Sequence, residues 1–458
     1  MKLRAKFAAT VTAVALTGAI APQAVSAGST LNGGGSTFVA NLVDICSAQY
    51  NRNSLSNPNT DVLSYSATGS GTGKTNFANN TYKWGASDSV YSSGAPSGFL
   101  YVPMVAGAIA VAYKLDGVTP AGSTVRLGNE TVAKIFAGQI KMWNDPLIAA
   151  DNKASVTPAT KKGVKAGVTT VIKKSGKKVA LTITATASGL KKFTGKSVTF
   201  TKTTTAGKTS KVGTALPLKS KVTQSFAYAA GDIYTVKVGT TSVAAVGVDD
   251  ITVGTTLSLP ATPIKVAYRS GNSGTTNNFT KYLNATSPTI WTKPANDAFG
   301  SAFPGTVPAD GTFQAASGSD GVSNYVKDNN GAITYTELSY ATERASAGVK
   351  TALVKNNAGI YTAPSAASSA AFYAEAAVDA TGVVTPDYAL AAADAYLINA
   401  IAYALVYTAN TEVNLGVKSY LTYFLGTCAP NNGPGAGYAP LTGSILTKAQ
   451  AQVAKIGA

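Results

Sequence analysis

The sequence predicts an α/β protein that carries an inserted all-β domain. In the outer parts of the chain, short apolar runs typical of strands alternate with amphipathic stretches typical of helices, which is the pattern of an α/β fold. In the middle of the chain, β-branched residues alternate with polar ones in a period of two, between turns that contain glycine. Three separate stretches combine glycine with serine or threonine, which allows the backbone to approach a small ligand closely.

The first 27 residues have the pattern of an export signal. Lys2, Arg4 and Lys6 precede an apolar run over residues 7–21, and small residues at 25–27 provide a cleavage site. We therefore expect residues 1–27 to be a signal peptide and the protein to act outside the cytoplasm, as a secreted, periplasmic or cell-surface protein. No cysteine follows the predicted cleavage site, so we expect no lipid anchor at that position.

The elements outside the middle segment follow from apolar periodicity. Residues 39–50 are expected to form a helix, because Val39, Leu42, Val43 and Cys46 lie on one face at helical spacing. The same reasoning predicts strands at 63–66 and 100–115 and helices at 131–138, 145–150, 275–283, 413–424 and 447–456. The alanine-rich residues 363–395 are consistent with either a helix or a loop.

Residues 153–256 form a basic segment with a distinct composition. This segment has 17 basic and 3 acidic residues, a net charge of +14 out of +17 for the whole chain. Alternating runs such as 178–184, 197–201 and 233–238 predict short antiparallel strands in a small sandwich. The basic segment is interpreted either as a solvated β-domain without a partner or as a surface that attracts anionic polymers.

The residue inventory excludes several kinds of chemistry. The chain has no histidine, which rules out Ser-His-Asp and Cys-His catalysis and histidine-ligated metal sites. Two cysteines are too few for a structural zinc site without other ligands, and we expect no metal, no cofactor and no enzymatic activity. Cys46 and Cys428 are expected to form a disulfide in an oxidising compartment, the alternative being two buried free thiols.

The three glycine-rich stretches predict an anion site. They span residues 33–38, 68–73 and 269–275, and each supplies backbone and hydroxyl donors. The third also supplies Arg269, whose guanidinium can donate two hydrogen bonds to one oxyanion. A nucleotide-binding P-loop is the alternative for the second stretch, but that pattern requires glycine at the position of Thr68.

Asp88 follows three small residues and has two interpretations. It could be a helix N-cap, which is a common role for aspartate at such a position. It could instead accept a hydrogen bond inside the anion site. A carboxylate there would favour an oxyanion that carries a proton and would repel one that carries none.

Several motifs in the right order resemble one family. Residues 33–38 and 65–73 are similar to the family's first two glycine-rich loops, and Gly85-Ala86-Ser87-Asp88 is similar to its Gly-Ala-Ser-Asp turn. Residues 135–146 match its hydrophobic-Gly-Ile-Trp-Asp-Pro segment, and residues 269–275 resemble its arginine loop. Residues 320–337 are similar to the segment that follows that loop, and residues 437–441 to its Gly-Tyr-Ala-Pro-Leu segment. The family is the phosphate-binding subunit of phosphate-specific ABC transporters, a class II substrate-binding protein with two lobes. The resemblance covers nearly all of the chain after the signal, except the basic segment.

The resemblance implies a function and a set of ligand residues. It implies capture of inorganic phosphate between two lobes, delivery to an ABC transporter permease, and no reaction. The implied phosphate contacts are Thr37, Phe38, Ser70, Asp88, Arg269, Ser273, Gly274 and Thr275. One departure is Gly271, because the family usually has an acidic residue there that holds the arginine.

The resemblance also implies the domain organisation. One lobe would comprise residues 28–104 and 396–458 and the other residues 105–152 and 257–395, with the inserted domain at 153–256. Two apolar strands, at 101–115 and 396–410, would cross between the lobes. The alternative function is a cell-surface structural or adhesion protein that uses the same fold, with the basic segment in contact with anionic wall polymers. We expect no specific nucleic acid partner.

Overall fold

The computed structural model describes most of the chain. The described residues are 28–153, 155–157, 160–175, 178–204, 208–227, 232–247, 251–253 and 256–458. The predicted signal peptide, residues 1–27, lies outside the described residues.

One large sheet runs through the body of the protein. Its order is β17-β16-β18-β4-β24-β3-β1-β2, and β19 and β25 also pair with β4. The strands are β1 Thr30–Gly35, β2 Val62–Ser66, β3 Trp84–Ser87, β4 Phe99–Tyr113, β16 Lys265–Arg269, β17 Phe313–Ala316, β18 Ala332–Glu337, β19 Lys350–Thr351, β24 Asn399–Tyr407 and β25 Tyr438–Pro440.

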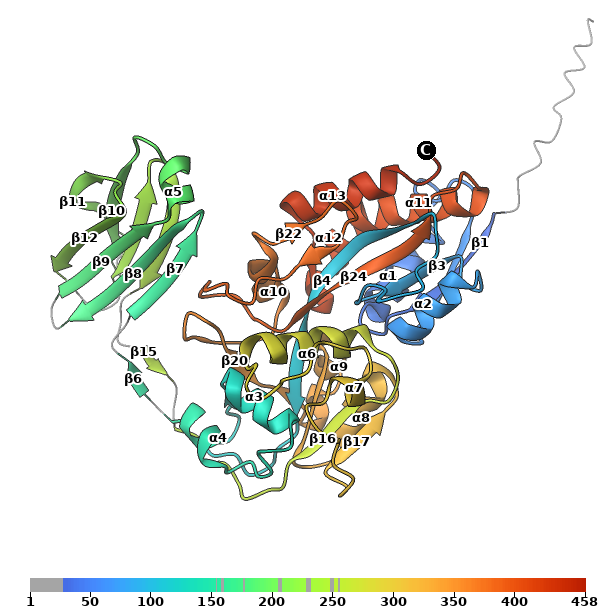
Figure 1. The fold of residues 1–458 in the computed structure, drawn as a ribbon, viewed down its shortest axis with the longest axis horizontal. Coiled ribbons are helices and arrows are strands. Elements are labelled where there is room, and N and C mark those ends of the chain that lie inside the picture. The colour runs from blue at the N-terminus through green and yellow to red at the C-terminus, as the bar shows by residue number, and fades with distance from the viewer. Residues whose placement is uncertain are drawn as a thin grey trace, which may run out of the picture.

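The sheet has two parallel ends and an antiparallel centre, which gives the body two lobes. Strands β1, β2 and β3 are parallel and belong to lobe I, whereas β16, β17 and β18 are parallel and belong to lobe II. Strands β4 and β24 pair antiparallel with each other and run between the lobes (Figure 1). They correspond to the two apolar runs predicted as crossing strands. The residue boundaries predicted for each lobe stay a prediction.

Helices cover the sheet close to the positions predicted from the sequence. The helices of the body are α1 Ala40–Tyr50, α2 Ser70–Ala78, α3 Asn129–Phe136, α4 Pro146–Asp151, α6 Gly274–Thr286, α7 Phe299–Ala302, α8 Gly318–Asp328, α9 Leu338–Thr342, α10 Ala366–Tyr373, α11 Glu412–Tyr423, α12 Ala429–Asn432 and α13 Gly443–Ala454. Capping side chains define where two of these helices begin. Asp145 caps α4, which has Pro146 in its first turn, and Ser273 caps α6.

Three features differ from the sequence prediction. Residues 70–73, expected to be part of a loop, form the first turn of α2, because Gly69 turns the chain at φ +94° directly before it. The alanine-rich segment contains α10 and then a hairpin of β22 Ala377–Val378 and β23 Val384–Thr385. A three-stranded sheet of β5 Arg126–Leu127, β20 Leu353–Lys355 and β21 Tyr361–Thr362 was also not predicted.

The basic segment folds as a sandwich with its own core. Its two four-stranded antiparallel sheets have the orders β11-β10-β13-β14 and β12-β9-β8-β7. The strands are β7 Thr160–Lys165, β8 Val168–Ser175, β9 Lys178–Ala185, β10 Ser197–Thr203, β11 Thr209–Pro217, β12 Lys221–Ala227, β13 Ile233–Val238 and β14 Thr241–Gly247, with the short helix α5 Ala187–Lys192. Leu181, Ile183, Phe200 and Val236 are among the buried residues between the sheets. The predicted all-β insertion is confirmed.

A short ladder connects this sandwich to lobe II. Strand β6 Ser155–Thr157 pairs antiparallel with β15 Ile251–Val253, and the sandwich lies beyond them in Figure 1. At the base of the ladder, the N–H of Leu257 donates to the carbonyl of Asn152 at 2.9 Å. The chain therefore leaves the body and returns to it at neighbouring positions.

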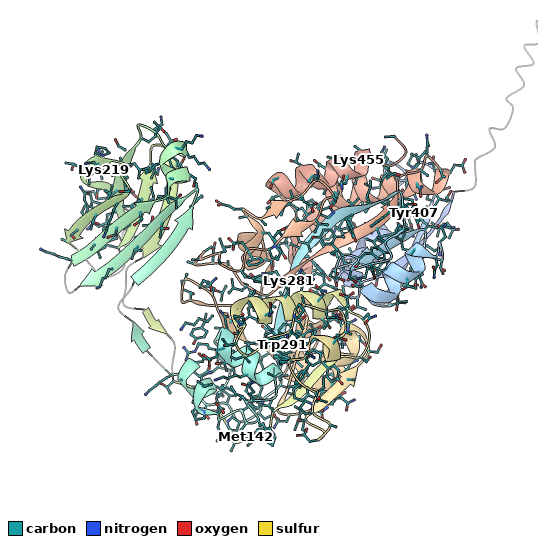
Figure 2. All side chains as sticks on the ribbon, in the orientation of Figure 1. Met142, Lys219, Lys281, Trp291, Tyr407 and Lys455 are labelled. Carbon is teal, nitrogen blue, oxygen red and sulfur yellow. A yellow bond between two sulfur atoms is a disulfide. The ribbon has the colours of Figure 1, made fainter. Side chains whose placement is uncertain are left out.

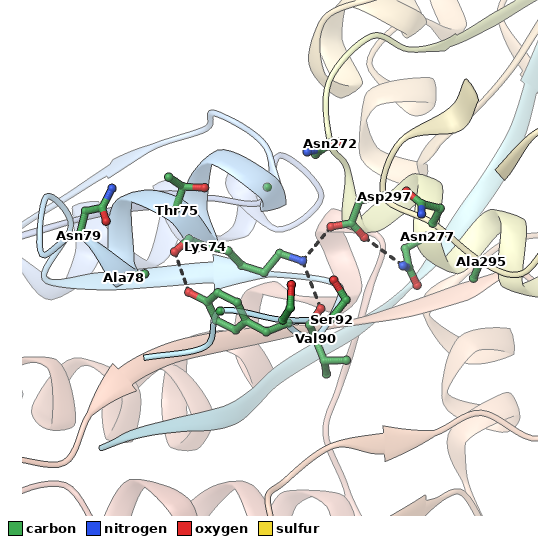
Figure 3. A pocket seen from close by; sticks show the side chains of 15 residues that line it. Lys74, Thr75, Ala78, Asn79, Val90, Ser92, Asn272, Asn277, Ala295 and Asp297 are labelled. Atoms are coloured by element: carbon green, nitrogen blue, oxygen red, sulfur yellow. Dashed lines mark hydrogen bonds and ion pairs between the residues drawn. The ribbon is translucent and has the colours of Figure 1, made fainter. Parts of the chain in front are cut away.

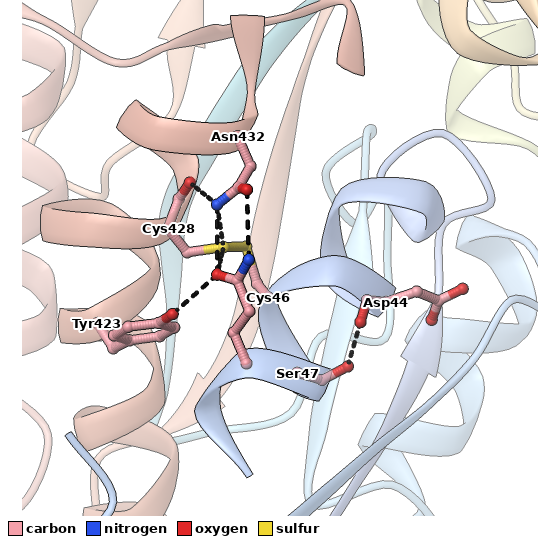
Figure 4. Close-up of a disulfide and its surroundings, with 7 residues drawn as sticks. Asp44, Cys46, Ser47, Tyr423, Cys428 and Asn432 are labelled. Atoms are coloured by element: carbon pink, nitrogen blue, oxygen red, sulfur yellow. Dashed lines mark hydrogen bonds between the residues drawn. A yellow bond between two sulfur atoms is a disulfide. The ribbon is translucent and has the colours of Figure 1, made fainter. Parts of the chain in front are cut away.

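Cys46 and Cys428 form a disulfide, as one of the two sequence interpretations predicted. Their Cα atoms are 5.7 Å apart and 382 positions separate them in the sequence. The bond joins α1 to the π-helical segment Phe424–Cys428 that follows α11, and Asn432 donates to the Cys428 carbonyl beside it (Figure 4). It closes the start of lobe I onto the C-terminal part of the chain. The free-thiol interpretation is wrong.

Within the described residues, every helix is too short or too polar to cross a bilayer.

Candidate functional site

The predicted ligand loops lie at the carboxyl ends of parallel strands in both lobes. Strand β1 leads into Ser36 and Thr37, β3 ends directly before Asp88, and β16 ends at Arg269. Register places these ends together in lobe I, since Gly34 pairs with Ser66 and Gly35 with Ala86. The carboxyl ends of parallel strands are the usual location of ligand sites in α/β sheets.

Asp88 is the centre of a buried ring of hydroxyl groups. Its Oδ1 accepts from Ser36 Oγ at 2.5 Å, and its Oδ2 accepts from Ser70 Oγ at 3.3 Å and from Thr275 Oγ1 at 3.4 Å. Thr275 belongs to lobe II, so this carboxylate already joins the two lobes. Asp88 follows a strand and caps none of the described helices, which makes the N-cap interpretation wrong.

Burial changes the proton affinity of Asp88. The side chain is 4% exposed, and this loss of solvation raises its pKa to about 6, against the lowering effects of the Ser36 hydrogen bond and of the Arg269 charge. The group therefore remains mostly ionised at neutral pH. An ionised carboxylate accepts hydrogen bonds and donates none.

Arg269 is a buried cation with unused donor capacity. Its side chain is 4% exposed, its Nη1 donates to Ser319 Oγ at 3.4 Å, and its buried Nε has no hydrogen-bond partner. Burial lowers the pKa of the guanidinium, and the negative charge of Asp88 is among the influences that raise it. An unsatisfied buried donor on a cation is costly, which marks a place suited to an anionic acceptor.

The carboxylate that faces Arg269 comes from the other lobe. Gly271 leaves the arginine without an acidic neighbour two positions along its own loop, and a Cβ there would touch nothing within 4 Å. Asp88 interacts electrostatically with Arg269, but the two form no ion pair within 4 Å among those of the described residues. A ligand bound between Asp88 and Arg269 would therefore contact a negative charge from lobe I and a positive charge from lobe II.

Thr37 and Phe38 lie at the edge of the same site. Thr37 Oγ1 is 2.9 Å from Ser319 Oγ, the group that also contacts Arg269. The Phe38 N–H donates to Ser36 Oγ at 3.0 Å, and its ring packs in the core edge-on to Tyr438. Thr37 thus connects lobe I to the arginine through one serine, whereas Phe38 supports the hydroxyl that binds Asp88.

The start of α6 supplies the lobe II side of the site. Ser273 caps this helix by accepting from the Thr276 N–H at 3.2 Å, which leaves the hydroxyl proton of Ser273 able to donate. The N–H groups of Gly274 and Thr275 belong to the first turn, where the helix provides no acceptor and concentrates positive potential. Donors of this kind bind anions in many proteins.

Gly274 lies in direct contact with lobe I. A Cβ built there would be 2.6 Å from Ser70 Oγ and 2.8 Å from the backbone N of Asp88. Beside it, the Gly71 N–H donates to the Asn272 carbonyl at 3.1 Å. The two lobes are therefore closed upon each other at the predicted anion site.

Two contributors to the site were not predicted as site residues. Ser36 Oγ makes the shortest contact with Asp88, and Ser319 contacts both Thr37 and Arg269. Ser319 lies in Ser317-Gly318-Ser319, with Gly318 at φ +66°. This is the same combination of glycine and serine that identified the other loops, so the signal was present in the sequence.

No group of three or more acidic or cysteine side chains that could hold a metal ion occurs among the residues that the structure describes. The donors of the site are hydroxyls, amides and a guanidinium, which are suited to an anion and not to a cation.

Comparison with protein families agrees with this geometry. Residues 21–255 and 249–427 match the model of the PBP superfamily domain. The chain belongs to the PBP superfamily. It is 26% identical over 292 residues to the phosphate-binding protein PstS 2 of Mycobacterium tuberculosis, covering 61% of this chain and 47% of that protein. It is also 26% identical over 323 residues to PstS 3 of Mycobacterium leprae, covering 69% of this chain and 55% of that protein. The chain spans about half the length of these curated relatives.

Solved structures show the same fold. A high-affinity periplasmic phosphate-binding protein (PfluDING), solved with phosphate, matches with a TM-score of 0.55 and 19% identity over 92% of this chain and 93% of that one. A phosphate-binding protein from Stenotrophomonas maltophilia matches with a TM-score of 0.50 and 18% identity, over the same shares. The two-lobed fold predicted from the sequence is therefore confirmed.

Proposed function

We propose that this protein captures hydrogen phosphate between its two lobes and delivers it to the permease of an ABC transporter. The observation that carries the proposal is the buried pair of opposite charges, Asp88 from lobe I and Arg269 from lobe II, surrounded by hydroxyl and amide donors. The named relatives, which are phosphate-binding proteins, support the same conclusion.

Each side of the site fits one property of the ion. We assign the negative oxygens to Arg269, to the hydroxyls of Thr37, Ser70, Ser273 and Thr275, and to the backbone N–H groups of Phe38, Gly274 and Thr275. When the ion binds, Ser70 and Thr275 would donate to it instead of to Asp88, and the Phe38 N–H would donate to it instead of to Ser36 Oγ. Asp88 would accept the hydrogen bond from the protonated oxygen. Sulfate carries no such proton, so the ionised Asp88 would repel it. Several charge-assisted hydrogen bonds of roughly 1.5–3 kcal/mol each are enough for micromolar binding, about 8 kcal/mol, after desolvation.

Replacement of Asp88 tests this assignment. In calorimetry at pH 7.5, wild-type protein should bind phosphate and show no binding of sulfate. Asp88→Asn should weaken phosphate binding by roughly 10- to 100-fold, the cost of about one charge-assisted hydrogen bond, and should allow sulfate to bind. Asp116→Asn, at an exposed carboxylate, is the control that should change neither affinity. If Asp88→Asn keeps the wild-type preference for phosphate over sulfate, Asp88 does not recognise the proton of the phosphate ion.

We further propose that the protein acts outside the cytoplasm. The signal pattern of residues 1–27 and the periplasmic phosphate-binding protein of the same fold support this location. Fractionation of expressing cells tests the location, which is wrong if the protein stays with cytoplasmic markers.

We also propose that the sandwich binds anionic polymers at the cell surface. Eleven lysines of its described part are exposed: Lys165, Lys173, Lys178, Lys191, Lys192, Lys196, Lys208, Lys211, Lys219, Lys221 and Lys237. Lys219 is labelled on it in Figure 2. Asp232, the one acidic residue of the segment within the described residues, is buried and paired with Lys202 at 3.1 Å. Retention on immobilised polyglutamate that salt does not weaken would contradict this electrostatic role.

A further inference from the structure

A second contact joins the lobes beside the anion site. Lys74 of α2, in lobe I, forms an ion pair with Asp297, in the lobe II segment before α7, with 2.7 Å between Nζ and Oδ2. Ser89 of lobe I donates to the same carboxylate oxygen at 3.0 Å. The interaction thus spans the two halves that must separate for an ion to enter or leave.

Lobe I holds Lys74 in place for this contact. Its Nζ also donates to Ser89 Oγ at 3.0 Å and to the Val90 carbonyl at 3.1 Å. The ring of Tyr91 lies 5.8 Å from the ammonium, and its hydroxyl donates to the Lys74 carbonyl at 2.6 Å. Figure 3 shows the Lys74 ammonium directed towards Asp297 of the other lobe. These contacts reduce the side-chain entropy that a free lysine would lose on pairing.

Lobe II holds Asp297 in place in the same way. Its Oδ1 accepts from Asn277 Nδ2 at 2.9 Å, and its backbone carbonyl accepts from the Ser273 N–H at 2.9 Å. Asp297 is therefore bound to the loop that presents Ser273 and to the helix, α6, that follows. On the other side, Lys74 is one turn along α2 from Ser70. The ion pair connects the two elements that hold the anion site.

The surroundings allow the ion pair to be both strong and reversible. The side chains of Lys74 and Asp297 are 12% and 16% exposed, so water screens the pair much less than a surface pair. The pair lies on the wall of a cavity of about 440 Å³ between the lobes, also lined by Thr75, Asn79, Asn272 and Asn296. Water in such a polar cavity can solvate both charges when the lobes part, which avoids burying an unpaired charge.

We propose that Lys74 and Asp297 are positioning residues that form an interlobe latch, which stabilises the closed state and slows the release of the bound anion. The latch acts through the position of α2 and of the Ser273 loop and does not touch the anion itself. The effect on release rests on the proposed phosphate binding, whereas the effect on closure does not.

The closing experiment therefore has two readouts. The first is hydrogen–deuterium exchange at Gly71 without phosphate. The Gly71 N–H lies in the first turn of α2, which offers no helical acceptor, and its acceptor is Asn272 of the other lobe. Its exchange rate therefore reports lobe opening. The second readout is the dissociation of radiolabelled phosphate after dilution into unlabelled phosphate.

Lys74→Met keeps an unbranched apolar side chain and removes the charged ammonium group. It should increase Gly71 exchange and phosphate dissociation by about fivefold or more, the effect of losing one partly desolvated ion pair. The matched control is Lys134→Met, which removes a 2.7 Å pair with Glu130 inside α3 and should change neither rate. The double variant Lys74→Met/Asp297→Asn should be no faster than the faster single variant.

The outcomes separate the two proposals. Gly71 exchange in Lys74→Met at the wild-type rate overturns the latch, whether or not phosphate binds. Faster Gly71 exchange together with no phosphate retention by the wild-type protein supports the latch and overturns the proposed function. Faster exchange in both lysine variants also overturns the latch, because it would show a general loss of stability.

Discussion

Glu337 is a buried carboxyl whose environment differs from that of Asp88. It ends β18 and caps α9, accepting from the N–H and the hydroxyl of Ser339. Burial nevertheless raises the pKa of Glu337 to about 8, because those two hydrogen bonds only partly offset the lost solvation. Asn41 of lobe I donates to Ser339 Oγ at 2.7 Å, so Glu337 lies at a junction of the lobes.

The raised pKa of Glu337 predicts a specific dependence of stability on pH. The folded state keeps this proton up to about pH 8, whereas the unfolded state loses it near 4.5. The proton on Glu337 therefore stabilises the folded state fully below about pH 4.5, and this stabilisation is lost as the pH rises to about 8. Relative to wild type, Glu337→Gln should gain unfolding free energy on the order of 3 kcal/mol between pH 5 and pH 8.

Urea denaturation followed by tryptophan fluorescence measures this difference. All three tryptophans, Trp84, Trp143 and Trp291, are buried in the core of the two-lobed body, so the signal reports the body and not the sandwich. Glu375→Gln, at an exposed site, is the control and should follow wild type at every pH. If the difference in unfolding free energy between Glu337→Gln and wild type does not change with pH, Glu337 is already ionised in the folded protein at pH 5.

At the scale of elements, the close contact of α6 with lobe I predicts the effect of one added methyl group. A Cβ on Gly274 would lie 2.6 Å from Ser70 Oγ, closer than real Cβ contacts allow, so Gly274→Ala should prevent full closure. We expect phosphate affinity to fall by about 100-fold or more, because the site is completed only when the lobes meet. Alanine also favours a helix more than glycine does, so thermal stability should not fall.

Calorimetry and thermal unfolding together check this prediction. Gly300→Ala in α7 is the matched control, because a Cβ there meets nothing within 4 Å. Affinity in Gly274→Ala equal to that of the control would contradict closure at this contact. If Gly274→Ala does not fold, the added methyl group instead strains the structure of lobe II itself.

The elements of the site were predictable where their signal is local. Gly33, Gly69 and Arg269 belong to short motifs with a stated chemical use, and the structure places their loops together. The combination of glycine with serine and threonine in residues 68–73 predicts a loop, whereas residues 70–73 form the first turn of α2. Close packing explains one of these glycines, since a Cβ on Gly73 would be 2.4 Å from the Gly35 Cα.

Contacts between distant segments were not predictable from a single sequence. Asp297 lies in a segment without a motif, and only the folded chain brings it to Lys74, 223 positions away. The Cys46–Cys428 disulfide is an exception, because the chain offers only one possible pairing.

At the scale of the whole molecule, the sandwich and the two-lobed body are separate units. Each has its own core, and the insertion point at Asn152 and Leu257 is fixed in lobe II: Asn152 exchanges hydrogen bonds with the backbone of Arg126 at 2.8–2.9 Å. Replacement of residues 153–256 by a short Gly-Ser linker should therefore leave phosphate affinity within about threefold of wild type and abolish retention on polyglutamate. Loss of phosphate binding in a folded deletion variant would make the sandwich part of the capture mechanism.

The disulfide and the latch act on different motions of the body. Cys46 and Cys428 join α1 to the C-terminal segment, and Lys74 and Asp297 join lobe I to lobe II. Closure can therefore be reversible while lobe I remains covalently fixed. Two-lobed proteins that bind a ligand between rigid halves commonly work by hinge closure of this kind.

The most direct test of phosphate capture is a crystal structure of the protein grown in millimolar phosphate. We expect a tetrahedral ion in contact with Ser70 and Asp88 of lobe I and with Arg269 and Thr275 of lobe II, with one oxygen within hydrogen-bond distance of the Asp88 carboxylate. Closed lobes without an ion between Asp88 and Arg269, or phosphate bound only on the sandwich, would contradict the proposed function.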